Sequence, residues 1–458
     1  MVCHNVREFG AVGDGSVNDT LAIQKAIDRC YEEGGGRVVI PSGGVYVTGT
    51  LVLKSNIELF IERGATIIGS SNIDDYSNVP PTRYRALIAA YDASNISITG
   101  GGVIDGNGRM FIETALPYIY RMRQRRPFAV FLLGCSNVTI HDVVLRDSAL
   151  WTIRLSGCKD VAISSTRILN DLKLPNNDGI DIDRCRNVQI SNCQIEAGDD
   201  CISLKACRET DGFGPCENIT VTGCTLVSTS AAIAIGCEAR SPIRNAVFNS
   251  CVIHSSHRGL AVHLSEESDM ENIIFSNIIV ETRLFHEDWW GMAEPIYITA
   301  IPWTAQHGIG HVRHIRFSNI LCRSENGVFI KGWDKSLIDD ILLENVRVEL
   351  DKWSKWPGGR QDIRPCPGEG LLDHPTSGFY IENGELILPQ PPKKGEEIIV
   401  MKKIPVLFFQ KQLPPNGIYV FTDKIENAVV IDFDKIQNLP KNKIIFSELP
   451  IVVKGNPN

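Results

Sequence analysis

Three aspartates lie in two short polar segments, Asn176-Asn177-Asp178-Gly179 and Gly198-Asp199-Asp200-Cys201. The first and second aspartates are 21 residues apart (199 minus 178), a spacing that fits one coil of a repeating β architecture. One coil would place Asp178 beside Asp199 and Asp200, so three carboxylates would share one patch. Mutual repulsion keeps one clustered carboxyl protonated near neutral pH while another stays ionised. Such a patch contains the acid and the base that hydrolysis of a glycosidic bond needs.

Two other roles for these aspartates stay open from the spacing alone. An aspartate patch can bind calcium, because carboxylate oxygens are its preferred ligands. The segment 176–179 can also be only a polar turn.

A repeated unit surrounds both segments. It consists of a polar residue, often Asn, followed by alternating apolar residues, a small polar break and another short apolar run. Successive copies start 23 to 31 residues apart, except for two intervals of 42 residues. The copies begin at Asn95, Asn137, Asp160, Asn187, Asn218, Asn245, Asn272, His314 and Asp340.

Short strands that recur at such an interval predict an all-β protein, a right-handed parallel β-helix in which each coil holds several strands. Neighbouring coils would hydrogen-bond at roughly 4.8 Å, and inward side chains would pack against the coils above and below. The recurrent Asn suits a coil corner, where its amide can bond its own backbone and the equivalent Asn above.

A short N-terminal helix is predicted to cap the open end of the solenoid, over about Thr20 to Glu33. Asn18 or Asp19 can begin it, and Gly34-Gly35-Gly36 ends it. Its apolar residues recur at helical spacing, at Ile23, Ala26, Ile27 and Cys30. We predict a β-helix catalytic domain over 1–383 and a C-terminal β-strand extension or cap over 384–458, where the repeat weakens.

Charge and composition limit the partners. The net charge is −8 and the pI near 5.8, which argues against a nucleic-acid partner. The dense basic run Arg121, Arg123, Arg125 and Arg126 is either a solvated loop or a local site for an acidic sugar. The sequence leaves the oligomeric state open.

The expected compartment is the cytoplasm. The N-terminus shows no signal peptide pattern, and no apolar stretch approaches the length that spans a membrane. Cys185, Cys193, Cys201 and Cys224 lie inside strand-like runs, so we expect buried, reduced thiols.

From Pro175 to Lys205 the chain reads PNNDGIDIDRCRNVQISNCQIEAGDDCISLK, and this string resembles glycoside hydrolase family 28, the polygalacturonases and their relatives. The resemblance covers roughly residues 5 to 383. It implies that Asp199 is the general acid and that Asp178 and Asp200 activate the attacking water. It also implies inversion at the anomeric carbon without a required metal, with acid and base roughly 6.5–9.5 Å apart.

The chain departs from that family where polygalacturonases grip their substrate. Ser230-Ala231-Ala232 stands where they carry Gly-His-Gly, and Ala261-Val262-His263 stands where they carry Arg-x-Lys. Losing cations would leave a uronate carboxylate poorly paired. The sugar at the cleavage site is therefore neutral, or it is a uronate held by other groups.

Candidates for substrate binding come from several parts of the sequence. The insertion between Asn272 and His314 contains tryptophans beside carboxylates, a combination that suits a sugar platform because sugar C–H faces stack on indole. The alternative for each candidate is a structural residue on the solenoid wall or surface. The candidates are Asn176, Lys205, His257, Arg258, His263, Trp289, Trp290 and Glu294.

The sequence thus predicts an inverting glycoside hydrolase for pectin-related or other plant cell-wall oligosaccharides. Enlarged loops in exo-acting family members favour release of terminal sugars. A polysaccharide lyase on the same scaffold, which would use calcium and a basic residue, and a non-catalytic carbohydrate-binding β-helix are the alternatives.

Overall fold

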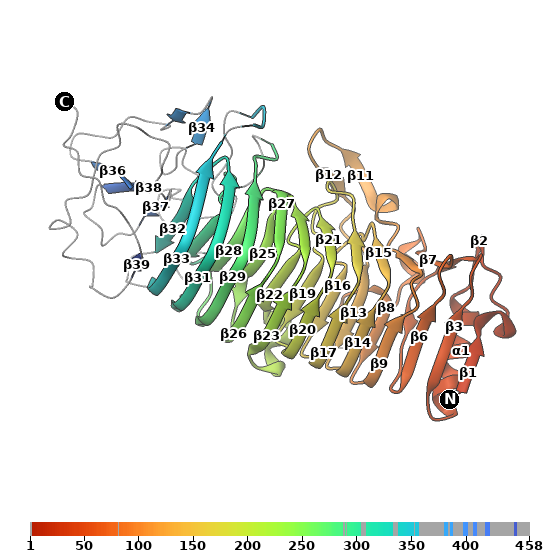
Figure 1. Ribbon diagram of the computed structural model, residues 1–458. Coiled ribbons are helices and arrows are strands. Elements are labelled where there is room, and N and C mark those ends of the chain that lie inside the picture. Colours follow the sequence, from red (N-terminus) through yellow and green to blue (C-terminus); the bar gives the residue numbers. More distant parts are fainter. Residues whose placement is uncertain are drawn as a thin grey trace. The chain divides into compact units, whose positions relative to one another are not determined.

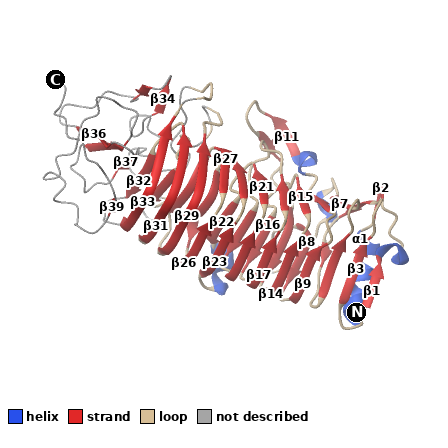
Figure 2. Cartoon of the chain, viewed as in Figure 1, coloured by secondary structure: helices blue, strands red, loops and turns tan. Residues whose placement is uncertain are grey.

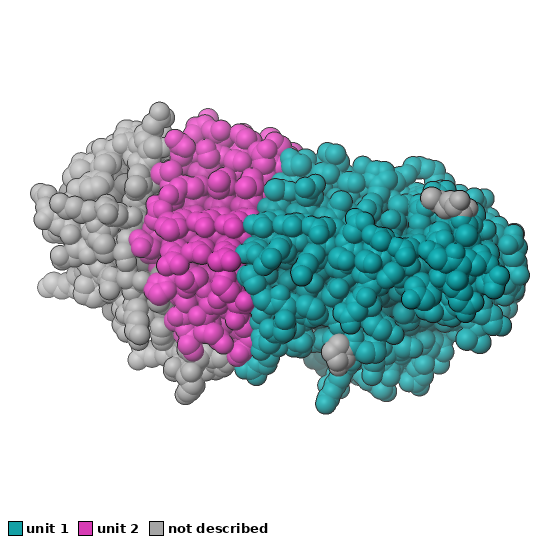
Figure 3. Space-filling view, turned by 90° about the horizontal axis from the view of Figure 1, so that it is seen from below, with its two compact units in different colours: residues 1–225 teal, residues 226–458 magenta. Residues whose placement is uncertain are grey.

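The computed structural model describes residues 2–80, 82–286, 289, 291–303, 308–332, 338–351 and 353–356, and several short strands between 380 and 446. The chain divides into two compact units, residues 1–225 and 226–458, which Figure 3 shows in different colours. Strands form nearly all of the regular structure in both units (Figure 2).

Three ladders of parallel strands build the first unit, which is a right-handed parallel β-helix (Figure 1). The first ladder consists of β1 (Val2–Asn5), β3 (Gly36–Ile40), β6 (Ile57–Ile61), β9 (Ser94–Thr99), β14 (Ser136–His141), β17 (Lys159–Ser164), β20 (Arg186–Ser191) and β23 (Cys216–Thr222). The second consists of β2 (Asp14–Asn18), β4 (Val45–Thr48), β7 (Thr66–Gly69), β10 (Val103–Asp105), β15 (Val144–Arg146), β18 (Arg167–Leu169) and β21 (Gln194–Ala197). The third consists of β5 (Leu51–Val52), β8 (Ala86–Tyr91), β13 (Phe128–Leu133), β16 (Ile153–Ser156), β19 (Ile180–Asp183) and β22 (Ile202–Ala206).

The alternation of apolar and polar residues explains the core of these coils. Val188 and Ile190 in β20 are buried while Gln189 between them is exposed, because successive side chains point to opposite faces of a strand. The register stacks like on like, with Val188 between Val161 of β17 and Ile219 of β23. Each coil therefore buries its apolar residues against the equivalent residues of its neighbours.

The recurrent Asn occupies a coil corner, as predicted. Asn95, Asn137 and Asn187 all have positive φ, a conformation that Asn adopts more readily than most residues. Their amides also form a ladder: Asn137 donates to Asn95, and Asn95 donates to Asn56, both at 2.7 Å. The polar residue that begins each repeat thus turns the chain and bonds to the coil beside it.

The capping helix α1 (Thr20–Glu32) begins and ends close to the predicted residues and packs against β1, β3 and β5. Its buried side chains are the four predicted ones, at Ile23, Ala26, Ile27 and Cys30. Asp19 is the N-terminal cap residue, but its carboxylate accepts from the backbone of Val12 and Gly13, while Asn18 accepts from Thr20. The other elements of the first unit are η1 (Val6–Phe9), η2 (Ile73–Asp75), η3 (Gly108–Phe111), η4 (Arg208–Phe213) and the antiparallel hairpin of β11 (Ile112–Ala115) and β12 (Tyr120–Met122).

The second unit contains the same kind of coil with longer strands. Its elements are β24 (Thr225–Ser228), β25 (Ala231–Ala239), β26 (Ile243–Asn249), β27 (Val252–Ser256), β28 (Arg258–Leu264), β29 (Met270–Thr282), β30 (Ile296–Ala300), β31 (Val312–Ser324), β32 (Val328–Gly332) and β33 (Ile338–Leu350). One ladder runs through β26, β29, β31 and β33, and another through β25, β28, β30 and β32. Aromatic rings stack along the ladder of β26, β29 and β31, with Phe275 between Phe248 and Phe317.

Most of the predicted C-terminal extension lies outside the described residues. The described strands there are β34 (Tyr380–Glu382), β35 (Glu385–Ile387), β36 (Glu397–Met401), β37 (Val406–Phe409), β38 (Gly417–Phe421) and β39 (Ile444–Phe446). The boundary at 383 stays a prediction. The helices of the described chain are all too short or too polar to cross a membrane.

Candidate active site

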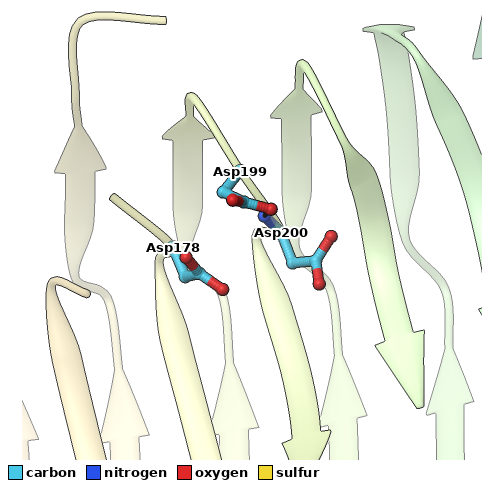
Figure 4. Close-up of side chains that lie close together, drawn as sticks. All are labelled: Asp178, Asp199 and Asp200. Atoms are coloured by element: carbon cyan, nitrogen blue, oxygen red, sulfur yellow. Dashed lines mark hydrogen bonds between the residues drawn. The ribbon is translucent and has the colours of Figure 1, made fainter. Parts of the chain in front are cut away.

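Neighbouring strands of the third ladder position the three aspartates. Ile180 of β19 pairs with Ile202 of β22, so Asp178 and Asp200 lie at equivalent places, two residues before each of these pairing residues. Backbone hydrogen bonds continue the ladder into this segment, since the Gly179 N–H donates to the Asp200 carbonyl at 2.8 Å. Figure 4 shows Asp178 on one coil and the adjacent Asp199 and Asp200 on the next. The stacking predicted from the spacing is therefore present.

Two glycines allow the motifs to approach each other closely. A Cβ on Gly179 would lie 2.4 Å from the Cys201 carbonyl oxygen, and one on Gly198 would lie 2.2 Å from the Leu174 carbonyl oxygen. The Gly198 N–H also donates to Oδ1 of Asn177 at 2.6 Å. The hydrogen bond from Gly198 to Asn177 thus holds one coil against the next. Any larger side chain at either glycine would push the two coils apart.

The carboxylates form a tight and partly buried cluster. One oxygen from each of Asp178, Asp199 and Asp200 lies within 4.8 Å of the others. Asp178 is 2% exposed and Asp200 is 8% exposed, while Asp199 is partly exposed. Among the described residues, Oδ1 of Asp178 is buried without a hydrogen-bond partner. This limit concerns one oxygen of each residue, so the separation of roughly 6.5–9.5 Å between the acid and base carboxyl groups stays a prediction.

The environment of Asp178 favours its protonated form. Burial, followed by the charges of Asp181 and Asp199, raises the pKa of Asp178 well above its usual value. Lys205 acts against this shift and Asp200 adds to it. Because the groups interact strongly, the protons belong to the cluster rather than to one residue. Asp178 therefore stays protonated to higher pH than an ordinary aspartate does.

Asp181 is a further acidic residue at this site, and it was not among the residues predicted from the sequence. It is fully buried, accepts a 2.6 Å hydrogen bond from Ser203, and lies 3.9 Å from Nζ of Lys205. Burial raises the pKa of Asp181 to about 7, against the opposing effects of Lys205 and Ser203. The alternation of Ile180 and Ile182 with aspartates signals this position, because inward isoleucines require Asp181 to face the other side.

Lys205 and Asn176, which were predicted to bind substrate, both lie next to the carboxylate cluster. Lys205 is buried, with Nζ 5.0 Å from the ring centre of Trp151. Asn176 is exposed, and its Nδ2 donates to Oδ2 of Asp199 at 3.1 Å. Their contact with a substrate stays a prediction.

The basic run divides into two parts. Arg121, Arg123 and Arg125 are exposed, as predicted, although Arg121 lies in strand β12 and not in a loop. Arg126 instead turns inward, and its guanidinium donates to Asn176 beside the aspartates. No feature of the local sequence distinguishes Arg126 from the other three, so only the fold reveals this contact.

The spacing of the three carboxylates would also suit a metal ion. Acidic groups often cluster without an ion, and a cluster that stores a proton needs the same proximity. We therefore assign no metal to these residues.

Residues 30–350 match the family model described as "Glycosyl hydrolases family 28". The match covers more than half of the 458 residues. The chain belongs to glycosyl hydrolase family 28.

The chain is similar to a protein of Vitis vinifera and to one of Dickeya chrysanthemi. The chain is 29% identical over 257 residues to a probable polygalacturonase of Vitis vinifera, covering 52% of each chain. It is 31% identical over 254 residues to an exo-poly-alpha-D-galacturonosidase of Dickeya chrysanthemi, covering 44% of this chain and 42% of the other. The chain thus spans about half the length of the curated relatives it matches.

A solved structure supports the same assignment. The exopolygalacturonase of Thermotoga maritima is 26% identical, with a TM-score of 0.67, over 77% of this chain and 88% of that one. The polygalacturonase of Erwinia carotovora is 21% identical with a TM-score of 0.61, over 74% and 93% of the two chains, and this likeness shows the fold.

The second unit contains the residues predicted to stand at the Gly-His-Gly and Arg-x-Lys positions of polygalacturonases. Ser230, Ala231 and Ala232 are all fully buried. His263 is also buried, with its ring centre 4.9 Å from that of Tyr297. Small residues therefore occupy the predicted Gly-His-Gly position.

Arg258 and Glu294, both predicted to bind substrate, contact each other instead of solvent. Nε of Arg258 donates to Oε2 of Glu294 at 2.9 Å, and the two side chains are 0% and 2% exposed. The guanidinium also stacks 3.8 Å from the ring centre of Tyr297. This geometry gives the pair a structural role, and a role in substrate binding stays a prediction.

His257 and Trp289 are the other described candidates in the second unit. His257 is buried, and its Nδ1 accepts a 2.9 Å hydrogen bond from the Phe285 N–H. Trp289 is partly exposed, and its indole N–H donates to the Thr229 carbonyl at 2.6 Å. Trp290 lies outside the described residues. The sugar platform therefore stays a prediction.

Proposed function

We propose that this protein is a glycoside hydrolase that acts on pectin-related oligosaccharides. The observation that carries the proposal is the cluster of Asp178, Asp199 and Asp200, whose nearest oxygens lie within 4.8 Å of one another. Membership of family 28 and the likeness to proteins named polygalacturonases support the same activity and substrate class.

In the proposed reaction, Asp199 gives its proton to the glycosidic oxygen as the bond between that oxygen and the anomeric carbon breaks. A water molecule held by Asp178 and Asp200 attacks the same carbon from the opposite side, and its proton passes to this pair. Return of that proton to Asp199 restores the site, so one water is consumed for each bond broken. Attack from the opposite side produces the inverted anomer.

Burial and the neighbouring carboxylates favour the protonated form of Asp178. Asp178 must be ionised to accept a proton from water, whereas Asp199 must be protonated to act as the acid. Since the groups titrate together, a substrate that changes the polarity around the cluster can shift the shared proton toward Asp199. The variants Asp199→Asn and Asp178→Asn therefore test the acid and the base separately.

We further propose that the enzyme releases terminal sugars. The supporting observation is that the relatives from Dickeya chrysanthemi and Thermotoga maritima are named as exo-acting enzymes. Time-resolved product analysis on a pectic oligosaccharide tests this: exo action yields one small product from the start, whereas endo action yields mixed lengths.

The test of the hydrolase function is a screen of pectic and hemicellulosic oligosaccharides with the wild-type protein and Asp199→Asn. We expect hydrolysis with an inverted product by NMR, and a loss of about 10²–10⁴-fold in Asp199→Asn. An aryl glycoside with a nitrophenyl leaving group should recover much of this loss, because that group departs without an acid.

Three outcomes would contradict the proposal. Near wild-type hydrolysis by Asp199→Asn would remove Asp199 as the acid. Ultraviolet-absorbing unsaturated products that vanish with a chelator would indicate a lyase. Binding without turnover across the whole panel would indicate a carbohydrate-binding protein.

A further inference from the structure

Arg126 is tied to the segment that carries Asp178. It lies between β12 and β13, and its Nη1 donates to the carbonyl oxygens of Ala149 at 2.9 Å and Pro175 at 2.8 Å. Its Nη2 donates to Oδ1 of Asn176 at 2.8 Å. The guanidinium thus bonds to three acceptors, two of which are the residues that precede Asp178 by two and three positions.

Asn176 extends this contact to the cluster. Its Oδ1 accepts from Arg126, and its Nδ2 donates to Oδ2 of Asp199 at 3.1 Å. A guanidinium can only donate, so the amide oxygen must face Arg126. The amide nitrogen must then face Asp199. Arg126 therefore determines which way the Asn176 side chain is rotated, and through it which group meets the Asp199 carboxylate.

We propose that Arg126 is a positioning residue that orients the Asp199 carboxyl group through Asn176. This inference rests on the proposed hydrolase function, in which Asp199 is the acid. Without Arg126, the Asn176 amide can turn its oxygen toward Asp199, where two acceptors repel each other. The same loss releases the carbonyls of Ala149 and Pro175 from their shared donor.

The positive charge of Arg126 favours the ionised form of the Asp199 carboxyl group, as the amide N–H of Asn176 does. The guanidinium is attracted to both Asp178 and Asp199 although burial lowers the pKa of Arg126 itself. Among the described residues, the charged groups that act on Asp178 also include Asp200, Asp181 and Lys205. A cation and an amide N–H both favour the ionised carboxylate. Removing Arg126 should therefore make the acid weaker and move its ionisation to higher pH.

Arg184 offers a matched control in the same unit. It is a buried arginine that donates to two backbone carbonyls, of Cys207 at 3.0 Å and Gly214 at 3.1 Å, and to one side chain, Asp211. These three hydrogen-bond acceptors all lie outside the aspartate cluster. Loss of Arg184 thus reports what removing a structural arginine does to this fold.

The experiment compares Arg126→Gln, Arg126→Lys and Arg184→Gln by kcat, KM and the pH dependence of kcat. For Arg126→Gln we expect kcat to fall by up to about a hundredfold, with a smaller change in KM and an alkaline limb at higher pH. Arg126→Lys should keep the limb close to its wild-type position but not restore kcat, because an ammonium keeps the charge without the planar fork. Arg184→Gln should lower the melting temperature and keep the wild-type pH profile.

A double variant tests the path through Asn176. If Arg126 acts through Asn176, Arg126→Gln combined with Asn176→Ala should be no slower than the more impaired single variant. Fully multiplicative losses would overturn the relay. A wild-type pH profile and kcat in Arg126→Gln, with only a lower melting temperature, would leave Arg126 as a structural residue.

A readout without turnover separates this inference from the proposed function. In protein labelled with ¹³C at the aspartate carboxyl groups, Arg126→Gln should move the Asp199 titration to higher pH, with Asp199→Asn identifying the signal. An unchanged titration would overturn the inference even in an active enzyme. A shifted titration in a protein that hydrolyses no glycan would support the inference about orientation and contradict the proposed function.

Discussion

Two groups of charged residues, one in each unit, show opposite ways of placing charge inside a β-helix. In the first unit Asp178, Asp199 and Asp200 bring like charges within 4.8 Å, and burial raises the pKa of Asp178. In the second unit Arg258 and Glu294 pair at 2.9 Å with both side chains almost completely buried. Like charges repel one another in the first group, whereas opposite charges neutralise each other in the second.

The difference indicates how to distinguish a chemical site from a structural one in this protein. Evolved folds seldom keep like charges together without a use, because repulsion and desolvation both destabilise the folded state. A buried ion pair with good geometry can instead be part of the packing. Removing a charge should therefore have opposite effects on stability in the two groups.

The largest expected effect is on catalysis by the aspartate cluster. Asp178→Asn removes a group that accepts the proton of water, and we expect kcat to fall by about 10²–10⁴-fold on the best oligosaccharide substrate. Steady-state kinetics on folded protein measure this. Ser203→Ala, which removes only a neutral hydroxyl bonded to Asp181, is the comparison and should lose much less. A small loss in Asp178→Asn would remove the chemical distinction between the two groups.

The next effect is on the stability of the second unit. Glu294→Gln removes the carboxylate that pairs with the buried Arg258 guanidinium at 2.9 Å, and we expect a loss of about 3–5 kcal/mol in the free energy of unfolding. Denaturant titration measures it. Asp351→Asn is the control, because its pair with Arg323 is exposed and should contribute about 0–1 kcal/mol. Equal losses in both variants would show that the Arg258–Glu294 pair is no more important than a surface pair.

A smaller effect concerns the contact between the two motifs. Gly198→Ala places a Cβ 2.2 Å from the Leu174 carbonyl oxygen, and the backbone shift that relieves it should cost about 1–3 kcal/mol. The variant should also lose activity, because Asp199 and Asp200 follow directly. Gly212→Ala is the matched control, since a Cβ there meets nothing within 4 Å. Wild-type stability in Gly198→Ala would contradict the close approach.

The smallest effect is a pH-dependent gain in stability. The folded state raises the pKa of Asp178, so its ionisation destabilises the fold as pH rises above the unfolded value of about 3.9. Asp178→Asn should melt at the wild-type temperature at lower pH and at a higher temperature near pH 7. Asp14 has a lowered pKa because Val17 and Ser16 donate to it, so Asp14→Asn should show the opposite sign. Scanning calorimetry between pH 3 and 8 measures both melting temperatures against the wild type. Melting temperatures equal to the wild type at every pH would contradict the prediction.

The fold was largely predictable because its signals are local and repeated. The Asn residues that begin each repeat have positive φ and bond to the coils beside them, and the four apolar residues of α1 are its buried face. Alternation in each strand determines which side chains face the core. The positions of Asp178 and Asp200 followed from the same period, because one coil separates them.

The partners of the charged residues were not predictable in this way. Arg126 is one of four arginines in a short run, and only the path of the chain after β12 brings its guanidinium to Asn176. Arg258 and Glu294 are 36 residues apart, and their pairing depends on how the intervening segment folds back. The sequence showed these residues as candidates for binding, but not which atoms they meet.

The sequence by itself determined the coil, its corners and the stacking of the three aspartates, because these depend on period and alternation along the chain. The tertiary structure alone decided which charges are compensated. It joined Asp181 to Ser203, turned Arg126 toward Asn176, and enclosed Arg258 with Glu294. Ion pairing and pKa depend on distances of a few ångströms between side chains and on exclusion of water, and loops that follow no repeat set those distances.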